Sequence, residues 1–184
     1  YRFVGRELRG KTLGILGFGL IGQRVGELGR AFLMNVVAYD PFLPAHVFEE
    51  QHAQSLSIAE VLRVSDFVTI HMPLTDETRH MFNAESLASM KPDAVVLNMA
   101  RGGIVDEKAM YEALKAGKIG GYATDVMEDE LAEGGLTEDA SMDSPLFECD
   151  NFIVTPHLGA QTVDASRDVG NYIIDKVKAA LSLS

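Results

Sequence analysis

The sequence predicts a doubly wound α/β fold whose sheet is mainly parallel. Short apolar runs alternate along the chain with stretches of helical spacing, which is typical of parallel strands joined by helical crossovers. A glycine-rich segment, residues 17–22, separates the first apolar run from the first helical stretch. The chain has 184 residues, 47% of them hydrophobic, so it can bury one core without disulfides or metals. We therefore expect one domain over residues 1–184.

The apolar runs are the expected strands, and they span residues 12–16, 35–39, 67–71, 94–98, 121–124 and 152–155. Helices are expected over residues 20–30, 57–64, 83–90, 106–116 and from 162 onward. Ser57 and Glu60 have the spacing of a capping box, and Gly117 stands where a helix end favours glycine. Residues 40–44 predict an irregular turn, and the acidic residues 128–150 predict a surface loop.

The charge and the apolar pattern exclude several function classes. The chain carries 16 Lys and Arg against 27 Asp and Glu, a net charge of −11, with no basic cluster for nucleic acid. No apolar run reaches the roughly 18 residues of a membrane span, and there is no signal-peptide pattern, so we expect a cytoplasmic protein that binds no membrane. The single Cys149 cannot form an internal disulfide, and we interpret it as inert.

The segment Gly17-Phe18-Gly19-Leu20-Ile21-Gly22 has the spacing of a dinucleotide-binding turn. It follows a predicted buried strand and opens a predicted helix. In that context the first glycine permits a tight turn, the second lets the backbone approach a pyrophosphate, and the third lets the helix pack on the strand. The helix N-terminus supplies N–H groups to the phosphates.

Asp40 stands at the end of the next predicted strand, 18 residues after Gly22. A carboxylate at this position can accept hydrogen bonds from both hydroxyls of an adenosine ribose, and it repels a 2′-phosphate. The sequence therefore predicts NAD as the cofactor, rather than NADP. The alternative is that the glycines form an ordinary turn and that Asp40 is a turn former before Pro41.

Three ionisable residues, Arg101, Glu130 and His157, follow the ends of later strands, where open α/β sheets bind ligands. A guanidinium can bind a carboxylate, an imidazole can pass a proton to a carbonyl, and a carboxylate can keep that imidazole protonated. Reduction of a 2-oxo acid needs this set. Taken singly, each residue also fits a structural interpretation: a solvated loop cation, one acid of an acidic loop, and a hydrogen-bonded histidine.

Several segments together resemble the D-2-hydroxyacid dehydrogenases, and the resemblance covers nearly the whole chain. They are residues 5–15, the glycine segment, His71-Met72-Pro73-Leu74-Thr75, Asn98-Met99-Ala100-Arg101-Gly102-Gly103 and Thr155-Pro156-His157-Leu158-Gly159-Ala160. The resemblance implies hydride transfer between NAD(H) and a D-2-hydroxy acid or 2-oxo acid, with 3-phosphoglycerate among the candidate substrates. It also implies a homodimer.

The resemblance assigns roles to individual residues. Arg101 would bind substrate, His157 would be the acid/base, and Glu130 would pair with His157. The remaining assignments concern the cofactor: Phe18 to Ile21 fall on its phosphates, Asp125 near its nicotinamide carboxamide, and further contacts are expected at His71, Pro73 and Ala100. His71 fits a structural histidine equally well.

The chain also departs from the family pattern. Leu131 replaces the usual proline after the glutamate, so Glu128 or Asp129 competes with Glu130, and Gln161 stands where the family often has serine. The family closes a second, lid domain over the nicotinamide, which 184 residues cannot hold, so the chain corresponds to the dinucleotide-binding domain alone. Three other histidines have no metal-ligand spacing, so we predict surface positions and no metal site; they are His46, His52 and His80.

Two alternative functions come from other classes. The chain could be a dinucleotide-sensing interaction module that acts through partners, as corepressors resembling this family do. It could also belong to a related NAD enzyme, such as a formate dehydrogenase, which needs a different proton donor. Turnover with 2-oxo acids would distinguish a dehydrogenase from the interaction module. Activity that persists without His157 would favour the related NAD enzyme.

Overall fold

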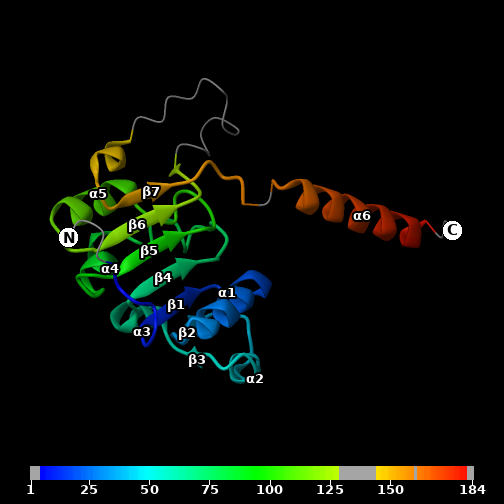
Figure 1. The fold of residues 1–184 in the computed structure, drawn as a ribbon, viewed down its shortest axis with the longest axis horizontal. Coiled ribbons are helices and arrows are strands. Elements are labelled where there is room, and N and C mark those ends of the chain that lie inside the picture. The colour runs from blue at the N-terminus through cyan, green and yellow to red at the C-terminus, as the bar shows by residue number, and fades with distance from the viewer. Residues whose placement is uncertain (1–4, 129–143, 160, 182–184) are drawn as a thin grey trace. The chain divides into compact units, whose positions relative to one another are not determined.

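The computed structural model describes residues 5–128, 144–159 and 161–181, and it divides into two compact units, Tyr1–Val154 and Thr155–Ser184. The first unit is built on a seven-stranded sheet in which every neighbouring pair of strands is parallel (Figure 1). This confirms the predicted fold class. The expectation of one dinucleotide-binding domain over residues 1–184 stays a prediction.

The strand order is β3-β2-β1-β4-β5-β6-β7, so the order reverses between β1 and β4. The strands are β1 (Thr12–Leu16), β2 (Asn35–Tyr39), β3 (Gln54–Ser55), β4 (Phe67–Ile70), β5 (Val95–Asn98), β6 (Gly121–Thr124) and β7 (Phe152–Val154). Six of them match the predicted strands to within one residue at either end. In an open α/β sheet, the point of reversal is where ligands bind, at the carboxyl ends of the strands.

Among the described residues, the helices of the first unit are α1 (Leu20–Ala31), α2 (Ala45–Glu50), α3 (Ile58–Val64), α4 (Ala84–Ala88), α5 (Glu107–Lys115) and the 3-10 helix η2 (Pro145–Glu148). Their ends follow the expected signals. Ser57 and Glu60 form the predicted capping box, and Asn83 and Asp106 cap α4 and α5 with their side chains. Gly117, just past α5, has a φ of +64°.

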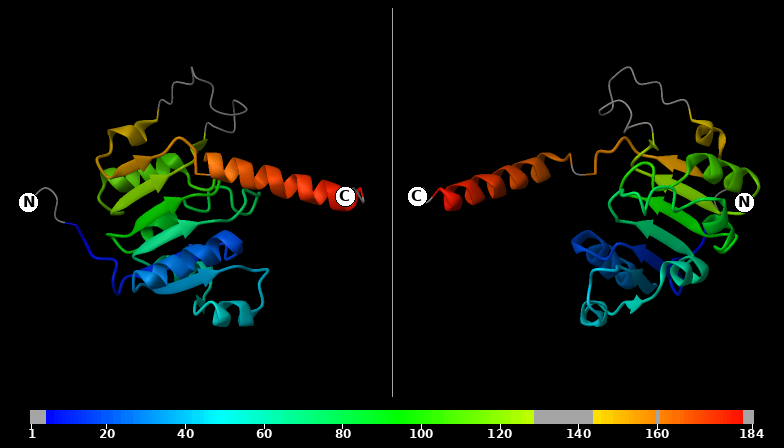
Figure 2. Two further views of the ribbon diagram at one scale, coloured as in Figure 1. Left: turned by 45° about the vertical axis from the view of Figure 1, so that its right-hand side comes forward. Right: turned by 180° about the vertical axis from the view of Figure 1, so that it is seen from behind.

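Helices cover both faces of the sheet (Figure 2). In β1, Leu13 and Ile15 belong to the core on the side of α1 and α2, and Leu16 belongs to the core on the side of α3, α4 and α5. Gly14 also faces α3, since a Cβ there would come within 2.6 Å of Val61. The alternation along one strand therefore divides the apolar residues between two cores.

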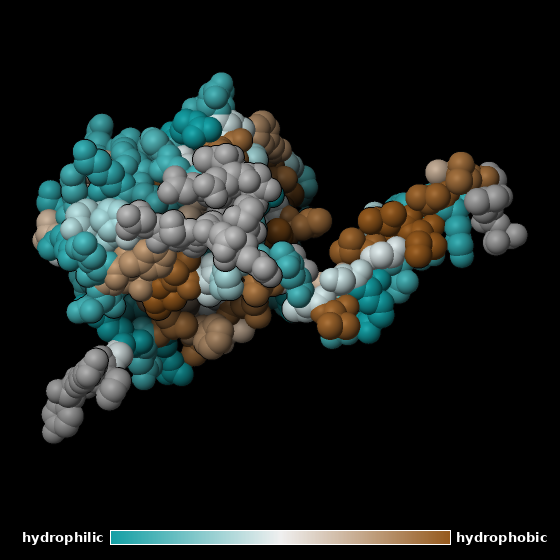
Figure 3. Space-filling view, turned by 90° about the horizontal axis from the view of Figure 1, so that it is seen from above, coloured by the Kyte–Doolittle hydropathy of each residue, from teal (hydrophilic) through white to brown (hydrophobic). Residues whose placement is uncertain are grey.

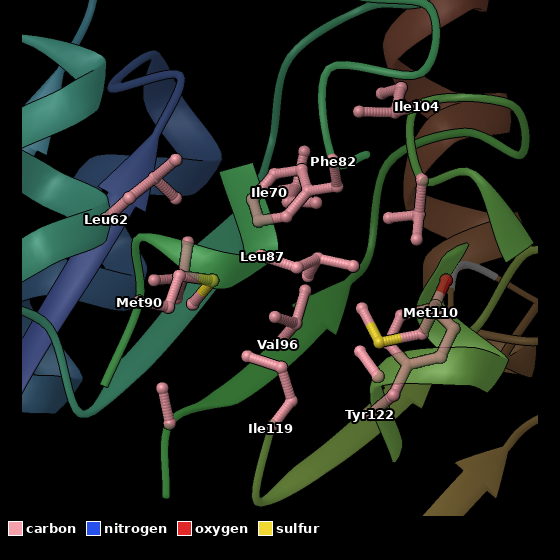
Figure 4. Close-up of a cluster of buried hydrophobic side chains, with 14 of the residues drawn as sticks. Leu62, Ile70, Phe82, Leu87, Met90, Val96, Ile104, Met110, Ile119 and Tyr122 are labelled. Carbon is pink, nitrogen blue, oxygen red and sulfur yellow. The ribbon is translucent and has the colours of Figure 1, made fainter. Parts of the chain in front are cut away.

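The larger core lies under α3, α4 and α5, and Figure 4 shows its side chains. Phe82, Met110 and Tyr122 are almost completely buried there. Burial of one large apolar side chain contributes about 1.5–3 kcal/mol. This core fixes the strands β4, β5 and β6, whose carboxyl ends carry the polar residues of the predicted site.

The structure corrects two regions of the predicted element pattern. The weakly patterned stretch after Pro44 contains α2 and the two-residue β3, held because Phe48 is buried and stacks on Phe18 with ring centroids 5.2 Å apart. The predicted surface loop 128–150 is wrong for its last part, where η2 places Leu146 in the larger core. Cys149 is buried beside it, which agrees with an inert thiol.

The described part of the second unit holds the helix α6 (Val163–Ala180), capped by Thr162 as expected. Hydrophobic side chains extend along it in Figure 3. The exposed apolar residues are Val163, Val169, Tyr172, Ile173, Ile174, Val177 and, just past its end, Leu181. Over the described ranges of the chain, none of the helices combines the length and apolarity needed to cross a membrane.

Candidate dinucleotide and substrate site

The turn after β1 requires glycine at two of its three motif positions. Gly17 has a φ of +90°, and a Cβ there would lie 2.8 Å from the carbonyl oxygen of His71. A Cβ on Gly22 would lie 2.2 Å from the carbonyl oxygen of Gly17. Gly19 instead has nothing within 4 Å of its Cβ position. The first and third glycines therefore serve the packing of β1 and α1, and the second leaves open space above the backbone.

That open space lies at the N-terminus of α1. Gly19 is the N-cap and supplies no side chain, so no side-chain acceptor occupies the first-turn N–H groups. Leu20 and Ile21 are 89% and 69% exposed in the first turn. A phosphate fits this position, because the helix N-terminus offers N–H donors and partial positive charge. Phe18 is fully buried, so only its backbone faces the turn.

Asp40 follows β2 with its carboxylate held from two sides. Its Oδ2 accepts a hydrogen bond from the Phe18 backbone N–H at 2.9 Å, and its Oδ1 accepts one from the Phe42 N–H at 3.0 Å. Each carboxylate oxygen has a further lone pair. The side chain is half-buried, so these lone pairs are available to a ligand with hydroxyl groups.

A pocket of about 590 Å³ opens beside Asp40. Its walls come from the ends of β1, β2 and β4 and from the segment after β4. The lining residues are Gly17, Gly19, Tyr39, Asp40, Pro41, Phe42, Ile58, His71, Met72, Pro73, Thr75, Glu77, Thr78 and Met81. Apolar walls with one oriented carboxylate suit an adenosine, since the base needs apolar contact and the ribose needs acceptors.

A second pocket, of about 600 Å³, shares part of this wall. It is lined by Ile21, His71, Met72, Pro73, Leu74, Met99, Ala100 and Arg101. The two pockets lie against the same short segment, His71 to Pro73, at the point where the strand order reverses. Two adjoining pockets flanking a phosphate-compatible helix N-terminus fit the two halves of a dinucleotide.

His71 follows β4 and lies in the wall of both pockets. Its Nε2 is 3.0 Å from the hydroxyl oxygen of Thr69. Burial lowers the pKa of His71 below its usual value, because desolvation disfavours the charged imidazolium. The neutral ring can pack against an uncharged part of a ligand.

Asn98 ties the ends of β5 and β6 together, and sequence reasoning did not single it out. It is 1% exposed. Its Nδ2 donates to the Arg101 carbonyl at 2.9 Å, and its Oδ1 accepts from the Ala100 N–H at 3.2 Å. Its backbone carbonyl accepts from the Asp125 N–H at 3.0 Å. One buried amide therefore positions the loop of Arg101 and the start of the segment after β6.

The Arg101 side chain is exposed at the second pocket, and its Nη1 donates to the Ala100 carbonyl at 2.6 Å. A guanidinium at this place can bind a carboxylate. The next residue, Gly102, packs tightly on the segment after β6, since a Cβ there would lie 2.1 Å from the Met127 carbonyl oxygen.

Glu128, which the sequence left open as an alternative to Glu130, contacts two other residues. Its Oε1 lies 2.6 Å from Nε2 of His80, and its backbone N–H donates to Glu107 at 2.7 Å. Glu128 is therefore a weaker competitor for the role assigned to Glu130. His80 lies at the surface as expected, with its side chain 42% exposed. Its contact with Glu128, 48 residues away in sequence, is one that no local spacing indicates.

The described residues bring most of the cofactor set to one edge of the sheet. Gly17 to Gly22, Asp40, His71, Pro73, Ala100 and Arg101 line the two pockets or the turn between them, and Asp125 is linked through Asn98. Glu130 lies outside the described residues. His157 belongs to the second unit, where it is exposed and has a φ of +54°. Across the described part of the chain, no group of three or more potential metal ligands occurs.

Comparison with known proteins decides the family. Residues 1–159 match the family described as D-isomer specific 2-hydroxyacid dehydrogenase, NAD binding domain. The chain belongs to this family. Its all-parallel sheet and glycine turn have the Rossmann-like arrangement of an NAD-binding domain.

Named relatives agree with this assignment. The chain is 45% identical over 181 residues to D-3-phosphoglycerate dehydrogenase of Methanocaldococcus jannaschii, covering 98% of this chain and 33% of that protein. It is 39% identical to hydroxypyruvate reductase of Thermotoga maritima, covering 97% and 56%. The crystal structure of D-lactate dehydrogenase from Aquifex aeolicus, complexed with NAD and lactic acid, matches with a TM-score of 0.84 at 35% identity, covering 99% and 56%. The chain thus spans between a third and about half of their lengths.

Proposed function

We propose that this chain is the NAD(H)-binding part of an oxidoreductase that interconverts a D-2-hydroxy acid and a 2-oxo acid. The observation that carries the proposal is the Asp40 carboxylate, oriented by the Phe18 and Phe42 N–H groups at the mouth of an adenosine-sized pocket. Family membership supports NAD as the cofactor, and the relatives named above support hydroxy acid chemistry.

On the cofactor side, each described residue has a distinct task. Gly19 leaves room for the pyrophosphate, and the backbone N–H groups of Gly19 to Ile21 donate to it, whereas the Phe18 N–H in the same turn holds Asp40. Asp40 accepts the ribose hydroxyls. His71 and Pro73 separate the adenosine pocket from the pocket of Ala100 and Arg101, which would take the nicotinamide half.

On the substrate side, Arg101 would bind the carboxylate of the acid, and His157 would exchange a proton with its 2-oxygen. Glu130 would hold His157 in its charged form, and Asp125 would bind the nicotinamide carboxamide. The bound nicotinamide supplies or accepts the hydride. We include 3-phosphoglycerate and hydroxypyruvate among the candidate substrates, since relatives bear those names.

We extend the proposal to assembly and location. The resemblance to D-2-hydroxyacid dehydrogenases supports a homodimer and a cytoplasmic enzyme. Sedimentation equilibrium over a range of concentrations tests the first, with a mass of twice 20.0 kDa expected. Fractionation of cells that express the chain tests the second.

Amide shift mapping by NMR tests the cofactor proposal. Titration with NADH should shift the backbone amides of residues 17–22, 40, 42, 71, 72, 74, 100 and 101 with one saturable dissociation constant. AMP alone should shift all of these amides except those of residues 100 and 101, because it reaches only the Asp40 pocket. The absence of saturable shifts with NADH would refute the proposed function.

A further inference from the structure

His80 and Glu128 form a pair that lies outside both pockets. Nε2 of His80 and Oε1 of Glu128 are 2.6 Å apart, and their side chains are 42% and 33% exposed. His80 stands in the segment that leads from β4 to α4, and Glu128 stands four residues after the end of β6. The pair therefore links two segments that leave different strands at the carboxyl edge of the sheet.

The loop that follows β5 lies between these two segments. On one side, the His80 N–H donates to the Gly103 carbonyl at 2.8 Å, and the Phe82 N–H donates to the Ile104 carbonyl at 3.2 Å. On the other side, Gly102 lies so close to Met127 that no side chain fits between them. The His80–Glu128 contact joins the two flanking segments directly, so that residues 101–104 are held between them.

Both partners are themselves held in place. His80 has a φ of +49°, a left-handed conformation that is unfavourable for a non-glycine residue and persists only where surrounding contacts enforce it. The Glu128 N–H is fixed by the Glu107 carboxylate of α5 at 2.7 Å. The geometry is thus built from three elements and does not depend on one flexible surface contact.

We propose that His80 and Glu128 are positioning residues that hold the Arg101–Gly103 loop against the segment after β6. The inference rests on the function proposed above, in which Arg101 binds the substrate carboxylate. Asn98 fixes the Arg101 carbonyl from β5, and the His80–Glu128 pair fixes the following residues from outside. Loss of the pair would make Arg101, which binds the substrate carboxylate, more mobile and would leave the Asp40 pocket intact.

Hydrogen exchange on the whole chain tests the proposal at the amides of His80, Phe82 and Asp106, which bridge the loop and its neighbour. The variant His80→Asn removes the imidazole and keeps a residue type that tolerates a left-handed backbone. His52→Asn is its matched control, since His52 has a φ of +47° on an exposed turn remote from the loop.

We expect His80→Asn to lower protection of these three amides by roughly threefold to tenfold, in the range of one partly exposed hydrogen bond. NMR order parameters of Arg101 and Gly102 should fall as well. Glu128→Gln should lower protection of the same three amides, and His52→Asn should change neither their protection nor the order parameters.

Unchanged protection in His80→Asn, or an equal loss at the His71 and Gly17 amides, would overturn the proposal. If His80→Asn fails to fold, Glu128→Gln decides the proposal, because unchanged protection of the three amides in that variant contradicts it. NADH titration distinguishes this outcome from failure of the proposed function: a chain that does not bind NADH refutes the function, whatever the loop does.

Discussion

The Asp40 carboxylate and the Phe18 backbone N–H are joined by a hydrogen bond of 2.9 Å between residues 22 positions apart. The bond connects the end of β2 with the glycine turn that follows β1. A carboxylate held in this way cannot rotate from the mouth of the pocket without losing a charge-assisted hydrogen bond, which contributes roughly 1.5–3 kcal/mol. If Asp40 binds the adenosine ribose as proposed, the contact between the first two strands sets the choice of cofactor.

Gly19 and Gly22 should respond differently to substitution, because Gly19 leaves space for a ligand and Gly22 is needed for packing. Gly19→Ala should change the free energy of unfolding by less than about 1 kcal/mol, because its Cβ meets no atom, and it should weaken NADH binding at least tenfold by filling the phosphate space. Calorimetric titration and chemical denaturation measure the two quantities.

Gly22→Ala is the matched packing variant. Its Cβ would meet the Gly17 carbonyl at 2.2 Å, so backbone must shift, and we expect a loss of about 1–3 kcal/mol in the free energy of unfolding. Equal effects of Gly19→Ala and Gly22→Ala on stability would contradict the division between the two positions.

Tyr122 should make the fold sensitive to alkaline pH. Burial raises its pKa to about 12, whereas the unfolded chain ionises near 10, so the folded state binds more protons between these values and stability falls as pH rises. The loss amounts to about 3 kcal/mol across that window. Below pH 10 both states are protonated, and Tyr122 contributes no pH dependence.

Denaturation of wild type and Tyr122→Phe at pH 9 to 12 measures this contribution. The variant should lose less stability than wild type over the window, and Tyr172→Phe, at an exposed position of α6, should follow wild type. Parallel curves for wild type and Tyr122→Phe would show that the buried phenol does not titrate as expected.

The 184-residue chain should bind NADH and turn over 2-oxo acids slowly. Arg101 is exposed at its pocket, so water weakens its contact with a substrate carboxylate, and the reacting groups are held loosely. Steady-state oxidation of NADH with pyruvate, glyoxylate and hydroxypyruvate checks this. A kcat on the order of 10 s⁻¹, typical of enzymes, would show that the chain holds a complete site.

Local signals in the sequence predicted the fold well where strands and caps carry them. β1, β2 and β6 were expected at their observed bounds, and the caps at Ser57, Asn83 and Asp106 were expected as found. The stretch holding α2 and β3 was missed because its helix has six residues and its strand two. Phe48 holds that stretch through contact with Phe18, which no local pattern reveals.

The site residues also fall into those that the sequence predicts and those that it does not. The spacing along one βαβ unit predicts Gly17, Gly22 and Asp40. Asn98 and the His80–Glu128 pair act between strands that are neighbours only in the folded sheet, so they required the structure. Asn98 carried one available signal, its place at the end of a buried strand before Arg101. The pairing of Glu130 with His157 stays a prediction.

Cofactor discrimination by Asp40 tests the central claim most directly, through calorimetric titration of wild type and Asp40→Asn with NADH and NADPH. Wild type should prefer NADH by about 10- to 100-fold, since the carboxylate accepts the ribose hydroxyls and repels a 2′-phosphate. Asp40→Asn should lose most of that preference, and Asp76→Asn, the same charge change on the exposed turn after Pro73, should keep it. Equal affinity of wild type for the two cofactors, or an unchanged preference in Asp40→Asn, would contradict the account.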